Sequence, residues 1–436
     1  MNQKKKNIDI KAILDRMDQL LDGKMEVYMN ACVRCGLCAD TCHYALANPD
    51  DPEMIPAYKI NKISSLYRRY HTVLGKLVPF WTGSNTLTEE YAKKLMDIVF
   101  GRCTMCGRCG LNCSVGLHTG QIVRAARMAL AEAGLVPESL QATVDNALRT
   151  GNNMAIAEKD FVDTIKWLEE DLQLELGNNT VKFPISHKDS NILYTLNPRE
   201  PKFFPLSISA VGKIFHIAKE SWTLSSTNYD VTNYALFSGN NSEARNIAHG
   251  LIEQAKKLNV NKLVMAECGH GFRSTRWEAA NWIGEKLSVK IVSILELLAV
   301  YIKSGRIKLD PSKNQERTTL HDPCNLVRNG GVIEEQRYIL KHAVTDFVEM
   351  TPNRTQNYCC GGGGGMLSMG KYSEQRKKSG KIKADQIKAT GAKVVATPCH
   401  NCIDQLTELN LIYKLNVKIK TVSEIVADAI IMPTAK

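Results

Sequence analysis

The 436-residue sequence contains no run of about 18 consecutive apolar residues, so we expect no transmembrane helix. Its N-terminal stretch also lacks the apolar core of a secretory signal, because charged side chains recur every few positions. We therefore expect the chain to stay in the reducing compartment where it is made. Because disulfides are rare there, the 14 cysteines are expected to be metal ligands.

No nucleic-acid-binding motif is present, although the chain carries a formal charge of +11. The positive charge fits an ordinary basic surface, an acidic partner or membrane surface, or compensation for an anionic cofactor. Two thiolate-bound iron–sulfur clusters of about −2 each would lower the charge to about +7. We therefore expect no nucleic-acid partner.

The hydrophobic pattern changes along the chain. Helical periodicity predicts helices at 8–23 and 156–176, and two more between 119 and 151 that are broken near Pro137. After about residue 186, short apolar strands alternate with helices, as in α/β units. Strands are expected at 191–196, 262–266, 317–321 and 393–397, and helices at about 241–258, 332–345 and 373–389.

Two identical cysteine runs lie in the helical part. The spacing Cys-x2-Cys-x2-Cys-x3-Cys, typical of bacterial two-cluster ferredoxins, places three thiolates on one cubane [4Fe–4S] cluster and the fourth on the other. This crossover assigns one cluster to Cys32, Cys35, Cys38 and Cys113, and the other to Cys103, Cys106, Cys109 and Cys42. Structural zinc is the alternative, but zinc needs no third cysteine at this spacing. The usual proline after the fourth cysteine is replaced by His43 and Ser114.

A second cysteine group lies in the C-terminal third. Its members are Cys324, the Cys359-Cys360-Gly361 motif, and Cys399-x2-Cys402. Five convergent thiolates exceed what one cubane or one zinc ion needs, and suit a distorted, opened cluster. The glycine run 361–365 could bring backbone amides close to sulfur or to an anionic substrate. His321, Asp322 and Pro323 precede the first of these cysteines at a strand end, where α/β folds place ligands.

The α/β region looks like a degenerate internal repeat. Pro198, Gly239 and Cys268 recur as Pro323, Gly361 and Cys399, at offsets of 125, 122 and 131 residues. In the earlier half, Arg199, Phe237, Ser238 and Gly271 stand where the later half has cysteines, and only Cys268 is kept.

On these motifs the sequence resembles the iron–sulfur D subunit of heterodisulfide reductases, from about residue 25 to 430. Among the relatives of that protein, it looks most similar to the K subunit of the Dsr complex and the B subunit of the Tmc complex of sulfate respiration. The resemblance implies a noncubane [4Fe–4S] cluster that reduces a disulfide. Its implied ligands are Cys324, Cys359, Cys360, Cys399 and Cys402. The run Glu267-Cys268-Gly269-His270 looks like the Dsr and Tmc branch, which favours a protein-borne disulfide or trisulfide, such as that of the sulfur carrier DsrC.

The resemblance implies a fold class and a domain order. The fold class is α+β, with a helical two-cluster ferredoxin-like module followed by a duplicated α/β Cys-Cys-Gly region. The expected parts are an N-terminal helix (1–24), a two-cluster domain (25–150) with a helical insert (43–102), a helical linker (151–185), a degenerate half (186–305) and a Cys-Cys-Gly domain (306–436).

The implied function is that of the catalytic component of a membrane-associated redox complex. Electrons from a membrane cytochrome b-type subunit would pass through two cubanes to the noncubane cluster and cleave a thiol disulfide there. The implied location is cytoplasmic and peripheral, on the inner face of the cell membrane. The alternative is a non-catalytic electron-transfer subunit of an anaerobic glycerol-3-phosphate or lactate dehydrogenase-type complex, because those complexes combine the same motifs. A non-redox scaffold does not explain eight ferredoxin-type cysteines.

Several other residues have two interpretations each. Cys268 is either an extra ligand or redox partner, or a buried thiol, and His270 is either a proton donor to a leaving thiolate or structural. Arg273, Arg276 and Arg328 could attract an acidic carrier or be solvated. The insert predicts a basic amphipathic helix that docks on a membrane or packs on its own module. Its apolar face is Ile60, Ile63, Tyr67, Tyr70 and Leu74, and its charged sides carry Lys59, Lys62, Arg69 and Lys76.

Overall fold

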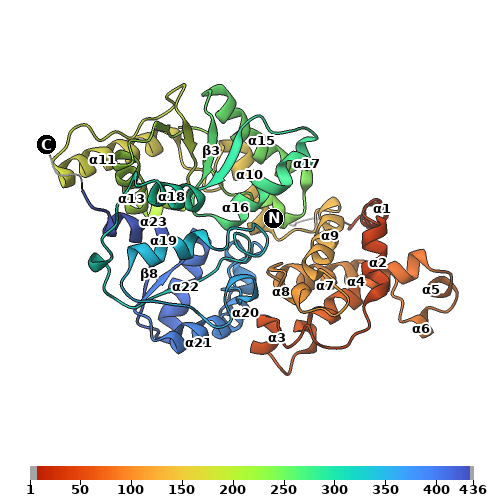
Figure 1. The fold of residues 1–436 in the computed structure, drawn as a ribbon. Helices are drawn as coiled ribbons and strands as arrows, with labels where there is room; N and C mark the ends of the chain where they lie inside the picture. The colour runs from red at the N-terminus through yellow and green to blue at the C-terminus, as the bar shows by residue number, and fades with distance from the viewer. Residues whose placement is uncertain (1–6, 433–436) are drawn as a thin grey trace, which may run out of the picture. The chain divides into compact units, whose positions relative to one another are not determined.

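The structure, a computed structural model, describes residues 7–432 and divides into two compact units. Unit 1 consists of Met1–Gln141, Tyr234–Asn241 and Gly361–Ile382. Unit 2 consists of Ala142–Asn233, Ser242–Cys360 and Lys383–Lys436. The chain therefore leaves unit 1 and returns to it twice, which the colours of Figure 1 allow the reader to follow. Within residues 7–432, no helix is both long and apolar enough to cross a membrane.

The regular secondary structure among the described residues of unit 1 is entirely helical. Its main helices are α1 (Ile10–Gln19), α2 (Gly23–Ala31), α3 (His43–Ala47), α4 (Pro56–His71), α5 (Val73–Leu77), α6 (Pro79–Thr82), α7 (Glu89–Gly101), α8 (Arg108–Leu111), α9 (Thr119–Glu132), α14 (Ala235–Ser238) and α20 (Ser373–Ser379). The apolar sides of α4 and α7 pack against α9 and form the core of this unit. The predicted break near Pro137 is confirmed, since α10 (Glu138–Thr150) begins just after it.

The first predicted helix is wrong in its extent. A single helix was expected over 8–23 with Gly23 as its stop, but α1 ends at Gln19 and α2 begins at Gly23. The cause is Asp22, whose carboxylate accepts a hydrogen bond from the Met25 amide at 2.7 Å and so caps a new helix.

The helix predicted in the insert is also shorter than expected. It ends at His71, because the Thr72 side chain caps α5 by accepting a hydrogen bond from the Gly75 amide. Ile60, Ile63 and Tyr67 are buried, so this face of α4 packs within unit 1 and is not free for docking. Lys59, expected on a solvated side, is buried as well, whereas Leu74 lies on α5 and is exposed.

Unit 2 contains two four-stranded parallel sheets. The first has the order β2-β1-β3-β4, and its strands are β1 (Ile192–Tyr194), β2 (Trp222–Thr223), β3 (Lys262–Met265) and β4 (Lys290–Ser293). The second has the order β6-β5-β7-β8, and its strands are β5 (Thr318–Leu320), β6 (Phe347–Val348), β7 (Val394–Ala396) and β8 (Lys418–Lys420). The spatial order is the same in both sheets: the first strand of each half lies between the second and the third, and the fourth lies at the edge beside the third. This identity of order is what the predicted duplication requires, and it confirms the α+β fold class.

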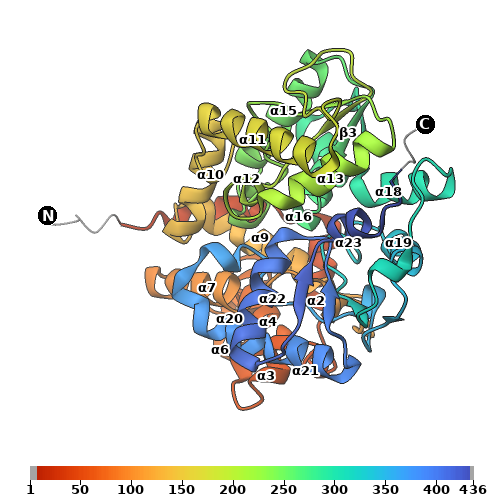
Figure 2. The ribbon, with the colours of Figure 1, turned by 90° about the vertical axis from the view of Figure 1, so that its left-hand side faces the viewer.

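The two halves of unit 2 share one hydrophobic core. Its helices include α11 (Glu158–Leu176), α13 (Pro205–Ile217), α15 (Asn241–Lys257), α18 (Ile294–Lys303), α19 (Glu335–Ala343), α21 (Lys381–Thr390), α22 (His400–Tyr413) and α23 (Val422–Ala429). Helix α13 of the first half packs on α23 of the second, and α18 packs on α19 (Figure 2). The halves are therefore joined through their helices, and neither sheet is buried by its own half alone.

Candidate metal centres

One cavity in unit 1 gathers the first predicted set of four cysteines. Its lining includes Cys32, Cys35, Cys38 and Cys113. Arg34 and Gly36, between these cysteines, have positive φ angles of 57° and 89° and turn the loop so that successive thiols face inward. All four cysteines are free thiols, as cluster ligands must be.

A second cavity gathers the other predicted set. Its lining includes Cys42, Cys103, Cys106 and Cys109. Cys109 lines both cavities, so the two sites are neighbours. Cys42 therefore lies with the later run of cysteines and Cys113 with the earlier one, as the ferredoxin-type crossover predicts. Two neighbouring cavities, each lined by one predicted set of four cysteines, fit two cubane clusters.

Two buried basic side chains lie at the second cavity. Lys59 lines the second cavity, is buried, and donates from Nζ to the Met54 carbonyl at 2.7 Å. Arg127 is fully buried beside it and donates to four backbone carbonyls, including that of Cys103 at 2.9 Å. Burial lowers the pKa of Arg127 to about 10, which leaves it charged near neutral pH. Burial raises the pKa of the Cys103 thiol, and the charges of Lys59 and Arg127 oppose that rise.

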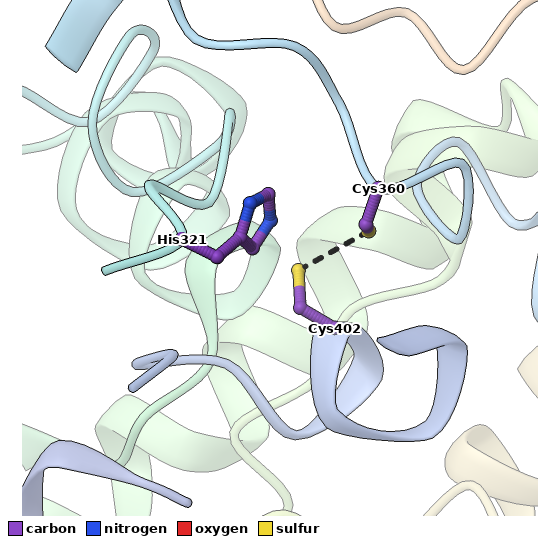
Figure 3. Close-up of side chains that lie close together, drawn as sticks. All are labelled: His321, Cys360 and Cys402. Atoms are coloured by element: carbon purple, nitrogen blue, oxygen red, sulfur yellow. Dashed lines mark hydrogen bonds between the residues drawn. The ribbon is translucent and has the colours of Figure 1, made fainter. Parts of the chain in front are cut away.

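The Cys-Cys-Gly cysteines lie at one end of the second sheet of unit 2. Strands β5 and β7 are adjacent and parallel, so the residues that follow them meet at the same edge. His321 and Cys324 follow β5, and Cys399 and Cys402 follow β7. The Sγ atoms of Cys360 and Cys402 are 3.5 Å apart, and Figure 3 shows the His321 imidazole beside both thiols. The possible ligand atoms of these three residues lie within 4.8 Å of one another.

The remaining cysteines of this group are also buried. Cys399 forms the N-cap of α22, and a hydrogen bond from Cys402 lowers the pKa of its thiol to about 7. Cys359 and Cys324 are 2% and 8% exposed. Buried, unoxidised cysteines at adjacent strand ends fit a metal–sulfur cluster better than a disulfide framework.

A buried lysine, unpredicted by the sequence, stands behind these thiols. Lys383 donates from Nζ to Asn357 Oδ1 at 2.7 Å and to Gln386 Oε1 at 2.5 Å. Burial lowers the pKa of Lys383 to about 7, against the opposing effect of Cys360 and other nearby anions. Its position could have been suspected, because Lys383 lies four residues before the buried Ile387, on the apolar side of its helix.

Asn357 connects the lysine to the histidine. Its Oδ1 accepts from Lys383, so its Nδ2 is the donor, and that nitrogen lies 3.4 Å from His321 Nδ1. His321 therefore accepts at Nδ1 and carries its proton on Nε2. That nitrogen has no hydrogen-bond partner among residues 7–432. The histidine thus presents an N–H group in the neighbourhood of Cys360 and Cys402.

A buried ion pair fixes the loop that carries His321. Arg337 on α19 donates to both carboxylate oxygens of Asp322, at 2.9 and 2.7 Å. Asp322 also accepts from the Arg354 amide at 2.7 Å. Arg337 and Asp322 are 1% and 2% exposed, so this bidentate pair is shielded from water.

The degenerate half repeats the geometry around Cys399. Cys268 follows β3 and caps α16 (Gly269–Arg273), with φ −141° and ψ 104°, close to the −166° and 113° of Cys399. Burial raises the pKa of the Cys268 thiol, and so does the charge of Cys399. His270 Nδ1 lies 3.5 Å from Cys268 Sγ, and burial lowers the pKa of His270 to about 3. An imidazole with that pKa is neutral near pH 7, so it carries one N–H group and no positive charge.

The three arginines that could have attracted an acidic carrier form hydrogen bonds within the chain. Arg273 binds Asn325 and Glu278, Arg276 binds the Ile291 carbonyl, and Arg328 donates to the carbonyls of Thr355 and Asn357. In the glycine run, the Gly364 carbonyl accepts from Arg127 in unit 1, and a Cβ at Gly364 would lie 2.8 Å from the Thr104 backbone. A glycine is therefore required at 364 for close backbone packing.

These sites define an iron–sulfur protein with a dicluster module and a separate cysteine-rich centre. Residues 28–117 match the family described as "4Fe-4S dicluster domain", and residues 318–407 match the family described as "Cysteine-rich domain". The first family was expected from the cysteine spacing and the second from the family resemblance, and the iron–sulfur assignment is confirmed.

Similar proteins make the class more specific. The chain is 28% identical to an Hdr-like menaquinol oxidoreductase iron–sulfur subunit of Archaeoglobus profundus, over 96% of this chain and 83% of that protein. It is 28% identical to iron–sulfur subunit 2 of the same name from Archaeoglobus fulgidus, over 98% and 84%. It is 27% identical to the D subunit of the dihydromethanophenazine:CoB–CoM heterodisulfide reductase of Methanosarcina mazei, over 93% and 95%. The chain is a heterodisulfide reductase-like iron–sulfur oxidoreductase subunit, as the resemblance implied.

Proposed function

We propose that this chain is the catalytic subunit of a membrane-associated complex that reduces a disulfide or trisulfide. Two cubane [4Fe–4S] clusters would occupy the cavities of unit 1, and a noncubane [4Fe–4S] cluster the five-cysteine site of unit 2. The observation that carries the proposal is the buried group of thiols where β5 and β7 end, with Cys360 and Cys402 3.5 Å apart. The names of the relatives, a menaquinol oxidoreductase and a heterodisulfide reductase, support it.

The proposed reaction needs two electrons and two protons to convert one disulfide into two thiols. When bound, the clusters would supply electrons one at a time. The residues of this chain would bind the clusters and hold the loops around them in place. Cysteine thiolates would hold the iron, the Lys383 ammonium would offset their negative charge, and the ion pair between Arg337 and Asp322 would keep the β5 loop in place. His321 presents an N–H group to the same space.

We further propose the physiological setting. Electrons would come from a membrane cytochrome b-type subunit, and the chain would sit on the cytoplasmic, inner face of the cell membrane, in a sulfate-respiring type of metabolism. A protein-borne disulfide or trisulfide, such as that of DsrC, is the proposed substrate. The run Glu267-Cys268-Gly269-His270 supports this choice, because it looks like that of the Dsr and Tmc branch.

Metal content and turnover test the proposal together. Anaerobically purified protein is expected to contain about twelve iron atoms per chain, since each of three [4Fe–4S] clusters holds four. With an artificial one-electron reductant it should reduce a disulfide, and a carrier-borne trisulfide faster than the heterodisulfide of coenzymes M and B. About twelve iron atoms without turnover would instead favour the electron-transfer subunit of a dehydrogenase complex. A value near eight would remove the noncubane cluster.

A further inference from the structure

An exposed apolar hairpin projects from the ferredoxin-like unit. It consists of α5 and α6, residues 73–82, and Figure 1 shows it extending beyond the end of α4. The exposed fractions are 72% for Val73, 73% for Leu77, 92% for Phe80 and 86% for Trp81. A protein surface in water seldom displays so many large apolar side chains together without a partner.

The hairpin is held in place by contacts with the end of α4. Gly75 lies so close to the Arg68 carbonyl that a Cβ atom would be 1.9 Å from the carbonyl oxygen. Arg69 Nη1 donates to the carbonyls of Gly75 and Lys76 at 3.3 and 3.0 Å, and Arg68 Nη2 donates to that of Gly83 at 3.4 Å. The apolar side chains are therefore presented by a built structure.

The charge around the hairpin has one sign. No aspartate or glutamate occurs between Glu53 and Glu89. The cations of this stretch outside the core are Lys62, Arg68, Arg69 and Lys76. Within residues 7–432, none of these four forms an ion pair with a carboxylate, and Lys76 is exposed on the hairpin. Uncompensated positive charge next to aromatic side chains complements an anionic lipid surface.

We propose that the α5–α6 hairpin inserts into the interfacial layer of an anionic lipid bilayer. Phe80, Trp81 and Leu77 would enter the boundary between headgroups and acyl chains, where aromatic rings are favoured, and Lys76 would face the lipid phosphates. The occupant is the lipid itself, so binding requires no other protein. This proposal deepens the membrane association proposed above and does not depend on the redox chemistry.

The hairpin is connected to one of the two cysteine loops. Arg34, between Cys32 and Cys35, donates from Nη2 to Asn61 Oδ1 at 2.8 Å, and Arg68 donates to the same oxygen at 3.1 Å. Because Arg68 also binds the Gly83 carbonyl, a continuous set of hydrogen bonds links the hairpin to this loop. Insertion would therefore hold the cluster site of Cys32, Cys35, Cys38 and Cys113 at the membrane side of unit 1.

Flotation of the purified holoprotein with protein-free vesicles tests the proposal. The vesicles are phosphatidylcholine containing phosphatidylglycerol, with pure phosphatidylcholine as the neutral comparison. The wild-type protein should float with the anionic vesicles and less with the neutral ones. The Phe80→Ser/Trp81→Ser variant should lose about tenfold or more in vesicle partitioning, because two aromatic rings no longer leave water.

A matched control removes exposed apolar residues elsewhere. Leu174 and Leu411 are 83% and 75% exposed on helices of unit 2, so Leu174→Ser/Leu411→Ser should float like the wild type. Iron content and disulfide turnover should be unchanged in both variants, which separates failure of lipid binding from failure of the redox proposal. Equal flotation of all three proteins, or no flotation of the wild type with anionic vesicles, would overturn the lipid assignment.

Discussion

At the scale of single residues, a buried lysine stands beside the thiols of each of two candidate centres. Lys59 lines one cubane cavity, and Lys383 lies behind the Cys-Cys-Gly thiols. The eight ferredoxin-type cysteines could be assigned from spacing alone, because cluster geometry dictates that spacing. The Cys-Cys-Gly cysteines were assigned from the family resemblance. The contacts of the two lysines could not be predicted, although the apolar side of its helix hinted at burial of Lys383, since the Met54 carbonyl and the Asn357 amide reach the lysines only in the folded chain.

Removing the buried charge of Lys59 should make one cubane harder to reduce. A unit charge beside a cluster at an effective dielectric of ~20 is worth roughly 1–3 kcal/mol, or on the order of 50–130 mV for one electron. The Lys59→Met variant should therefore show a midpoint potential lower by that amount for the cluster held by Cys103, Cys106, Cys109 and Cys42. Redox titration followed by electron paramagnetic resonance measures the change.

The control for this prediction is Lys62→Met. Lys62 lies one turn further along α4, is partly exposed, and places its ammonium 5.2 Å from the centre of the Tyr58 ring. Water screens its charge, so this variant should leave both potentials nearly unchanged. Equal shifts in the two variants would show that the second cavity is not tuned by its buried lysine.

At the scale of elements, the sequence predicted what local burial decides. The apolar runs that form β1, β3, β5 and β7 were predicted correctly, because each is buried on both faces of a parallel sheet. Strand β6 has only two residues, and β8 has a lysine at each end, so neither gives a recognisable pattern. The predicted helix over 373–389 divides at Gly380, where α20 ends and α21 begins.

The ion pair between α19 and the β5 loop is expected to be essential to unit 2. In an Arg337→Met variant, the Asp322 carboxylate would remain buried without its cation, at a cost of about 3–5 kcal/mol. Urea unfolding of the anaerobic protein should show that loss, together with weaker iron retention at the five-cysteine site.

The comparison for this variant is Arg317→Met. Arg317 pairs with Asp346 at 2.8 Å, but the two side chains are 51% and 45% exposed. Solvent screening reduces such a surface pair to under about 1 kcal/mol. If both variants unfolded at the same urea concentration, the Asp322–Arg337 pair would not be the support that its burial suggests.

At the scale of the whole molecule, the sequence order of the modules hides how the units are built. Tyr234–Asn241 and Gly361–Ile382 belong to unit 1, although they lie far along the chain. The first segment contains Phe237-Ser238, and the second begins directly after Cys359-Cys360, the matching position of the internal repeat. Helix α14 packs on α9, and α20 packs on α3. These long-range contacts depend on shape and had no local signature, whereas the ligand sets did.

The central claim is that the five-cysteine site performs disulfide reduction and the two cubane sites supply it. The most direct test is disulfide turnover by the Cys360→Ser variant, with the cubane signals recorded on the same sample. We predict loss of turnover by about a hundredfold or more, since iron loses a ligand at the reacting site, while both cubane signals stay intact. Full turnover in this variant would contradict the account.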